Sequence, residues 1–224
     1  MASVVALAAC RGPAPDGRPG TVPPAQSTAT TAPAATTAPV PTTGAPAPGS
    51  RAVTVAYRVE RRVDDRATEG FESFVEQTLT DPRGWRRAGF DLVRGDDAPH
   101  VVVLAEGDEV DRLCLPYDTY GLYSCQNGPV VALNADRWRS ATAKWTGDLE
   151  TYRAMLVNHE VGHLLGQRHP PVNCPARGRP APVMAQQSTE LNGCLPNPWP
   201  LPSEIDRAAR HDLPIAPPFS RGKG

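Results

Sequence analysis

Residues 158–169 read Asn-His-Glu-Val-Gly-His-Leu-Leu-Gly-Gln-Arg-His, and this stretch constrains the structure more than any other part of the sequence. His159 and His163 are four residues apart, so on a helix both side chains project from one face and can bind one zinc ion. Glu160 lies about 100° around the helix from His159, close enough to reach a water on that metal without binding the metal. Gly166 allows a sharp turn that would bring His169 back as a third nitrogen ligand. Three protein ligands leave a fourth position open, which is typical of a catalytic zinc site.

The hydrophobic pattern around this stretch predicts one α+β domain over residues 51–213. The longest helix is expected from about Asp148 to Leu165, with acidic residues at its positive N-terminal end. Further helices are expected over 68–79 and 203–210, capped by Thr68 and Ser203. Strands are expected over 53–59, 90–93, 100–104 and 129–133.

The N-terminal residues, MASVVALAAC, are almost wholly apolar and end at a cysteine. Leu7-Ala8-Ala9-Cys10 resembles the lipobox of bacterial lipoproteins, in which the cysteine is acylated and becomes the new N-terminus. We therefore expect residues 1–10 to be a lipoprotein-type signal segment, with lipidation at Cys10. The apolar region is short and no basic residues precede it, so a buried or frayed terminal strand is the alternative.

The composition outside the domain predicts flexible segments. Residues 11–50 are rich in Pro, Ala and Thr and contain no aromatic residue, so they cannot bury enough apolar area to offset the entropy of ordering. We expect a disordered tether there and a flexible tail over 214–224. The net charge of −1 provides no general attraction for nucleic acid or anionic lipid. No apolar run approaches the about 20 residues that span a bilayer, so membrane contact is expected only through the lipid, and the protein is expected to be a monomer.

Four cysteines remain once Cys10 is assigned to lipid: Cys114, Cys125, Cys174 and Cys194. Export would place them in a compartment where disulfides persist. Four cysteines allow three pairings, and pairing Cys114 with Cys125 and Cys174 with Cys194 closes the shortest loops. Zinc ligation by cysteine is the competing interpretation, but the sequence has no C-x-x-C pair.

The pattern His159-Glu160-x-x-His163-x-x-Gly166-x-x-His169 matches the signature of the metzincins, a clan of zinc metallopeptidases, and the chain resembles them. The resemblance implies a small twisted mixed sheet packed on the zinc-binding helix, and a methionine in a tight turn beneath the metal. Met184 is the candidate for this Met-turn, with a plain core methionine as the alternative. Some metzincins place a tyrosine two residues after the methionine; Gln186 stands there, so the stabiliser of the transition state stays unassigned.

A closer resemblance is to an uncharacterised actinobacterial family described as zinc-dependent peptidases of metzincin type. Four segments carry it: 81–85, 157–163, 181–184 and 197–200. In metzincins an extended substrate pairs with an edge strand above the zinc helix. Val130, Val131 and Ala132 are the candidate strand, although an ordinary core strand would read the same. Trp199 could wall a substrate pocket or only pack against the Pro-rich C-terminal region, and we favour packing.

These observations predict a zinc-dependent peptidase with one catalytic Zn²⁺, acting on a protein or peptide outside the cytoplasmic membrane. Glu160 would be the general base that takes a proton from the attacking water and delivers it to the departing amine. Two alternatives stay open. One is a non-catalytic envelope-binding lipoprotein on a peptidase-like scaffold, and the other is a zinc amidase that acts on cell-wall peptide.

Overall fold

A computed structural model describes residues 52–217 of the 224-residue chain. The predicted signal segment, the lipidation site Cys10 and the tether lie outside the described residues, as does the end of the predicted tail. None of the helices in the described region has the length and apolar character that crossing a membrane requires.

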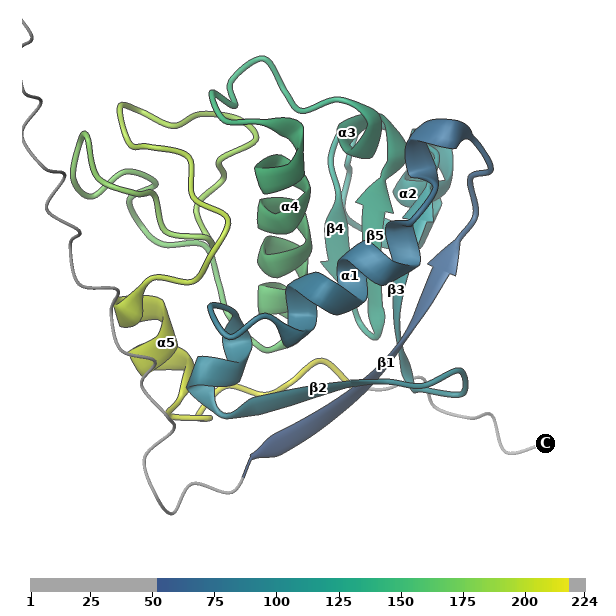
Figure 1. Ribbon diagram of the computed structural model, residues 1–224, viewed down its shortest axis with the longest axis horizontal. Helices are drawn as coiled ribbons and strands as arrows, with labels where there is room; N and C mark the ends of the chain where they lie inside the picture. The colour runs from purple at the N-terminus through teal and green to yellow at the C-terminus, as the bar shows by residue number, and fades with distance from the viewer. Residues whose placement is uncertain (1–51, 218–224) are drawn as a thin grey trace, which may run out of the picture. The chain divides into compact units, whose positions relative to one another are not determined.

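A five-stranded mixed sheet forms the centre of the domain (Figure 1). The strands follow the order β2-β1-β3-β5-β4 across the sheet. β1, β2, β3 and β5 run parallel to their neighbours, while β4 pairs antiparallel with β5. The bounds of the strands are β1 Val53–Arg61, β2 Phe90–Arg94, β3 His100–Ala105, β4 Cys125–Asn127 and β5 Val130–Asn134. A mixed sheet in an α+β domain agrees with the expected fold class.

Helices cover both faces of this sheet. α1 crosses one face in Figure 1, and α4, the long helix expected to bind zinc, packs with it in the larger hydrophobic core. α2 covers the opposite face in a smaller core. The helices are α1 Phe71–Thr80, α2 Gly107–Cys114, α3 Ala135–Arg139, α4 Leu149–Leu164 and α5 Pro202–Ala208, with short 3-10 helices η1 Arg66–Thr68 and η2 Trp85–Ala88.

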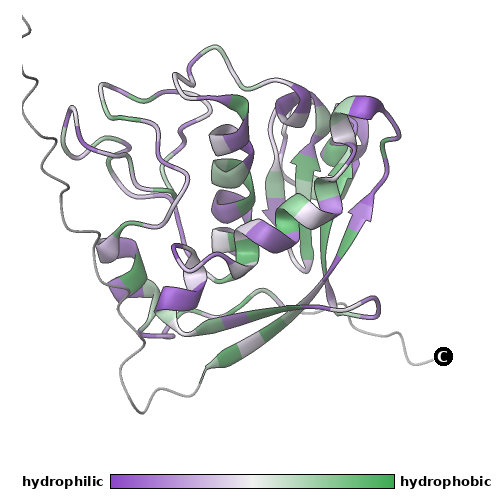
Figure 2. Cartoon of the chain, in the orientation of Figure 1, coloured by the Kyte–Doolittle hydropathy of each residue, from purple (hydrophilic) through white to green (hydrophobic). Residues whose placement is uncertain are grey.

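The central strand β3 is buried on both faces, which explains its unbroken apolar sequence. Val102 and Leu104 belong to the core shared with α1 and α4, whereas Val101 and Val103 pack toward α2. Strands buried on both sides read as continuous rather than alternating hydrophobic runs. Figure 2 shows the apolar residues concentrated on these central strands.

Local capping chemistry sets the helix boundaries. The Asp148 side chain accepts a hydrogen bond from the backbone N–H of Thr151 at 2.7 Å, so α4 begins where the sequence predicts. The two predicted caps, Thr68 and Ser203, are wrong. α1 begins after Gly70, whose φ of 75° suits glycine, and Thr68 lies in η1 instead. Pro202 is the first residue of α5, a position that proline favours, so Ser203 lies inside the helix rather than before it.

The predicted substrate strand is not at the edge of the sheet. Val130, Val131 and Ala132 belong to β5, which is fully buried and pairs with β3 on one side and β4 on the other. Their backbone groups are therefore already used in the sheet, and no peptide can add beside them. The free edge is provided by β4, whose three residues carry no apolar alternation that would mark them as a strand.

The predicted tail begins as part of the domain rather than as a flexible segment. The backbone N–H of Ala216 donates to the carbonyl of Leu164 at 2.9 Å. A ring nitrogen of His100 lies 3.0 Å from the carbonyl of Ala216, and Ile215 packs against the core. Residues 214–216 are thus fixed against the end of α4, which moves the boundary of the domain toward the C-terminus.

Two disulfides close local loops. Cys114 pairs with Cys125 and Cys174 pairs with Cys194, the pairing that the shortest-loop argument predicts. The first joins the end of α2 to the edge strand β4. The second lies in the irregular segment that follows α4.

Candidate metal centre

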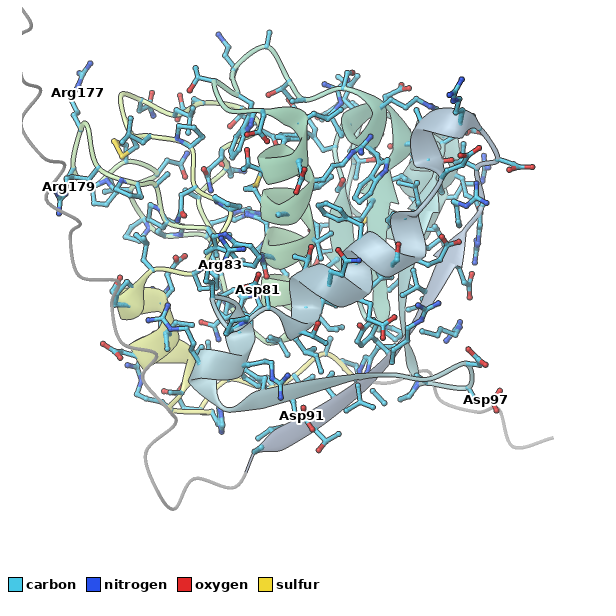
Figure 3. The ribbon with its side chains drawn as sticks, in the orientation of Figure 1. Asp81, Arg83, Asp91, Asp97, Arg177 and Arg179 are labelled. Carbon is cyan, nitrogen blue, oxygen red and sulfur yellow. A yellow bond between two sulfur atoms is a disulfide. The ribbon has the colours of Figure 1, made fainter. Side chains whose placement is uncertain are left out.

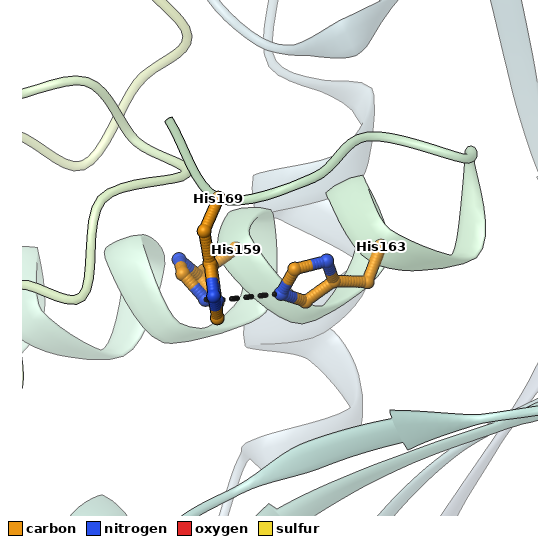
Figure 4. Close-up of side chains that lie close together, drawn as sticks. All are labelled: His159, His163 and His169. Atoms are coloured by element: carbon orange, nitrogen blue, oxygen red, sulfur yellow. Dashed lines mark hydrogen bonds between the residues drawn. The ribbon is translucent and has the colours of Figure 1, made fainter. Parts of the chain in front are cut away.

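Three imidazoles converge at the end of α4 (Figure 4). His159 and His163 project from the helix, and His169 approaches from the loop that follows it. Nε2 of His169 lies 3.2 Å from Nε2 of His159 and 3.1 Å from Nε2 of His163. Gly166, with a φ of 83°, makes the turn that returns His169, and a Cβ there would lie 2.8 Å from the carbonyl oxygen of Pro214. The structure thus brings together all three predicted metal ligands.

The hydrogen bonds on the far side of two rings fix their tautomers. Nδ1 of His159 lies 2.8 Å from the carbonyl oxygen of Val183, and Nδ1 of His163 lies 2.8 Å from that of Gln167. A carbonyl can only accept a hydrogen bond, so each Nδ1 carries the proton. In the neutral rings both Nε2 atoms therefore present lone pairs toward His169, whose single ring proton cannot satisfy both. A shared cation satisfies all three nitrogens.

The electrostatics of the site keep these rings neutral. Burial, together with the neighbouring charge of His163, lowers the pKa of His159 to about 3. Burial lowers the pKa of His163 to about 4 and also lowers the pKa of His169. Neutral imidazole is the form that binds a metal.

The spacing of the three nitrogens fits a zinc ion. Nitrogen ligands at about 2.0–2.1 Å from zinc in tetrahedral geometry lie about 3.3 Å apart. The two observed separations are within about 0.2 Å of that value, and the ligand atoms of the group all lie within 4.8 Å of one another. The donor set therefore suits zinc and leaves one tetrahedral position for another ligand.

A cavity of about 450 Å³ opens beside the histidines, and Glu160 lines it. Burial raises the pKa of the Glu160 carboxyl to about 8. A cation held by the histidines would lower this pKa again by favouring the charged form. Among residues 52–217 the Glu160 carboxylate has no hydrogen bond or ion pair, so it is free to act on a molecule in the cavity.

Met184 is fully buried and lies against α4. It packs against Gly162 on α4 so closely that an added Cβ at Gly162 would collide with Sδ of Met184. The same Cβ would lie 2.8 Å from Cζ2 of Trp85. A glycine is therefore required between the two metal-site histidines of the helix, because sulfur and indole fill the space where a side chain would start.

A buried carboxylate holds the turn that contains Met184. Glu204 on α5 accepts hydrogen bonds from the backbone N–H groups of Val183 and Met184, both at 2.9 Å, and from that of Leu201 at 2.8 Å. The carbonyl of Val183 in turn accepts the bond from His159. Glu204 thus supports a metal-site histidine through one peptide unit, a role that sequence spacing gave no means of finding.

The two tryptophan segments singled out by sequence support α4 from outside the cavity. The indole N–H of Trp85 donates to the carbonyl of Asn158 at 3.0 Å. Arg83, paired with Asp81 in the same turn (Figure 3), stacks over the ring of Trp199 at 4.2 Å. Trp199 does not line the cavity, so the packing interpretation of this residue is correct.

Several cavity residues were not foreseen. The walls include two arginines, Arg137 and Arg168, and the amide residue Gln186. Side chains next to the disulfide-bonded edge strand, among them Tyr117 and Tyr123, form another wall. They come from separate elements of the chain, so only the fold brings them together. The remaining two histidines, His100 and His211, contact backbone carbonyls and do not line the cavity.

Comparison with known proteins places the chain in a family. No curated protein matches it. A solved structure, archaemetzincin from Methanopyrus kandleri, is similar with a TM-score of 0.40 and 14% sequence identity; the match covers 70% of this chain and 95% of that one. The family described as "Protein of unknown function (DUF3152)" matches residues 22–202, most of the sequence, and the chain therefore belongs to this family.

Proposed function

We propose that this chain is a zinc-dependent peptidase. The observation that carries the proposal is the convergence of three imidazoles, with Nε2 of His169 at tetrahedral spacing from the other two Nε2 atoms, beside an unpaired buried carboxylate in a cavity. A purely structural zinc site uses all four positions for protein ligands and has no need of such a carboxylate. The Met-turn role of Met184 is part of the same proposal, supported by its packing against Gly162, which lies between His159 and His163 on α4.

The residues divide the chemistry between them. Zinc in a three-histidine site supplies Lewis acidity and lowers the pKa of a coordinated water toward about 7. Glu160 takes a proton from the attacking water as the water oxygen bonds to the scissile carbonyl carbon. Glu160 then delivers that proton to the amine nitrogen as the carbon–nitrogen bond breaks. Val183 and Gln167 hold the tautomers of His159 and His163 throughout, because their carbonyls accept the Nδ1 protons.

We also propose that the protein acts outside the cytoplasmic membrane, anchored by a lipid on Cys10. The two disulfides support export, since such bonds persist in oxidising compartments. Mass spectrometry of the protein from the membrane fraction of its host tests the anchor. An acyl group on Cys10 is the expected result, and an intact Met1 N-terminus would contradict it.

The experiment that tests the enzymatic proposal joins metal analysis to a cleavage assay. Purified protein is expected to contain one zinc per chain and to cleave members of a broad peptide library. Glu160→Gln should keep the zinc and lose cleavage, and His163→Ala should lose both. Glu150→Gln is the matched control, because Glu150 is exposed in the first turn of the same helix. Bound zinc with no cleavage that depends on Glu160 would favour a binding protein instead, and cleavage confined to cell-wall peptide amides would favour an amidase.

A further inference from the structure

The charged side chains around the cavity are unbalanced. Other than the histidines and tyrosines, three lining residues have ionisable side chains: Glu160, Arg137 and Arg168. Burial favours the neutral form of Glu160, so the two arginines make the cavity wall positive even before a metal is bound, although the whole chain has a net charge of −1. A positive wall of this kind raises the local concentration of anionic ligands.

Arg137 is held in place by the backbone of α3. This short helix directly follows β5, and the Asn134 side chain caps it by accepting from the N–H groups of Asp136 at 2.9 Å and Arg137 at 3.4 Å. β5 is an interior strand packed beside α4, so the cap fixes Arg137 to the rigid part of the domain. The backbone from which the Arg137 side chain projects is therefore positioned by the fold.

The guanidinium of Arg137 lacks partners in the part of the chain that the structure describes. Its Nε is buried and has no hydrogen-bond acceptor, and no carboxylate lies within ion-pair distance. The contrast with its neighbour Arg139 is clear: Arg139 forms ion pairs with Asp65, Glu106 and Asp136 at 2.6–3.0 Å. A buried donor without an acceptor is costly. Because Arg137 lines the cavity, the rest of its guanidinium is available to a partner from outside the chain.

Arg137 and Glu160 line the same cavity, and both affect a third residue, Tyr152. The hydroxyl groups of Tyr152, a buried residue of α4, and Ser188 share a hydrogen bond of 2.9 Å. Burial raises the pKa of the Tyr152 hydroxyl; the Ser188 hydrogen bond and the charge of Arg137 lower it, and the charge of Glu160 raises it. The charges of Arg137 and Glu160 thus both act on one phenol, and both residues line the same cavity as the three histidines.

We propose that Arg137 binds a carboxylate of the substrate next to the scissile bond, so that the enzyme selects peptides with an acidic side chain or a free C-terminus at that point. The planar guanidinium fork matches a carboxylate with two parallel hydrogen bonds. This inference rests on the proposed peptidase function for its substrate, and it assigns Arg137 to specificity rather than to the bond-breaking step. Arg168, exposed at the rim, adds attraction of longer range.

The test uses four versions of a peptide that the zinc-loaded full chain cleaves. The first two carry Glu or Gln beside the cleavage site with the C-terminus amidated. The other two are truncated so that the C-terminus lies at that position, as a free acid or an amide. Wild type is expected to favour a carboxylate in one of these pairs by about 10- to 150-fold in kcat/KM, the range for a hydrogen bond to a charged group. The first pair reports an acidic side chain and the second a terminal carboxylate.

Arg137→Met should abolish that preference mainly by raising KM for the carboxylate peptide, and Arg137→Lys should restore part of it. Arg112→Gln, at an exposed arginine that does not line the cavity, is the control and should change nothing. Equal kcat/KM values within both pairs in wild type would overturn the proposal, even where an Arg137 variant fails to fold. A loss of kcat shared by all four peptides would also overturn it, because that result makes Arg137 a stabiliser of the transition state.

A binding measurement separates this proposal from the peptidase proposal. The same peptides are titrated into the Glu160→Gln variant, which is expected not to cleave them. A second titration uses the double variant Glu160→Gln, Arg137→Met. Tighter binding of the carboxylate peptide that disappears with Arg137→Met supports the specificity role even if wild type proves to lack peptidase activity. Equal dissociation constants for acid and amide would refute the role while leaving the peptidase proposal intact.

Discussion

Substitution of Glu204 should destabilise the domain and weaken metal binding, although Glu204 lies on α5 and does not contact the histidines. Its carboxylate is buried and accepts three backbone N–H groups, two of them from the turn that holds Met184. Glu204→Gln keeps the shape of the side chain but replaces one carboxylate oxygen by an NH₂ group. An NH₂ group cannot accept a hydrogen bond, so it cannot pair with the backbone N–H groups that it faces. Hydrogen bonds to charged groups contribute about 1.5–3 kcal/mol each, so the loss of one or two should lower the free energy of unfolding by about 1.5–6 kcal/mol.

The same change should weaken metal binding, because the Val183 carbonyl that orients His159 belongs to this turn. Loss of such outer support typically costs 10- to 100-fold in metal affinity. Urea denaturation of the metal-free protein gives the first quantity, and competition with a chelator gives the second. Asp206→Asn, at an exposed position on the same helix, should leave both unchanged. If Glu204→Gln matches wild type in both measurements, Glu204 does not support His159 as described.

Three further changes probe the scaffold. Gly162→Ala should destabilise the domain by about 1–3 kcal/mol through overpacking, measured by thermal unfolding. It should also reduce the zinc content found by metal analysis. No change in stability would show that Met184 and Trp85 can move to make room for the methyl group. Gly166→Ala should lose at least about 1–2 kcal/mol because of its left-handed backbone, and an unchanged melting temperature would contradict this. Hydrogen bonds from Arg139 lower the pKa values of Glu106 and Asp65, so wild type should lose stability as the pH falls from about 5 through the acid range. Arg139→Met should flatten that dependence in urea titrations between pH 6 and 3, and an equally steep dependence would refute it.

The parts of the fold that sequence predicts well are those fixed by local periodicity. α4 follows its apolar repeat and its Asp148 cap, and β3 follows its run of valines, because burial on both faces leaves no room for polar residues. The metal ligands were predictable for the same reason. The spacing of His159 and His163 is meaningful only on a helix, and the helix was evident.

The errors arose where pairing rather than periodicity determines structure. β4 consists of Cys-Gln-Asn and becomes a strand only because β5 lies beside it. Because the hydrophobic pattern carries no information on strand order, the sequence does not reveal that β5 lies between β3 and β4 rather than at the edge of the sheet. Arg137 and Glu204 were missed for a related reason. Each acts on the site from another element of the fold, so no spacing within the sequence connects either residue to the histidines.

The most direct test of the proposed mechanism is the ratio of peptide-cleavage rates for wild type and Glu160→Gln, compared at equal zinc content under single-turnover conditions. Removal of a general base typically slows the step by about 10²- to 10⁴-fold, and the mechanism predicts a loss in this range with the metal retained. Equal rates for the two proteins at one zinc per chain would contradict the role assigned to Glu160.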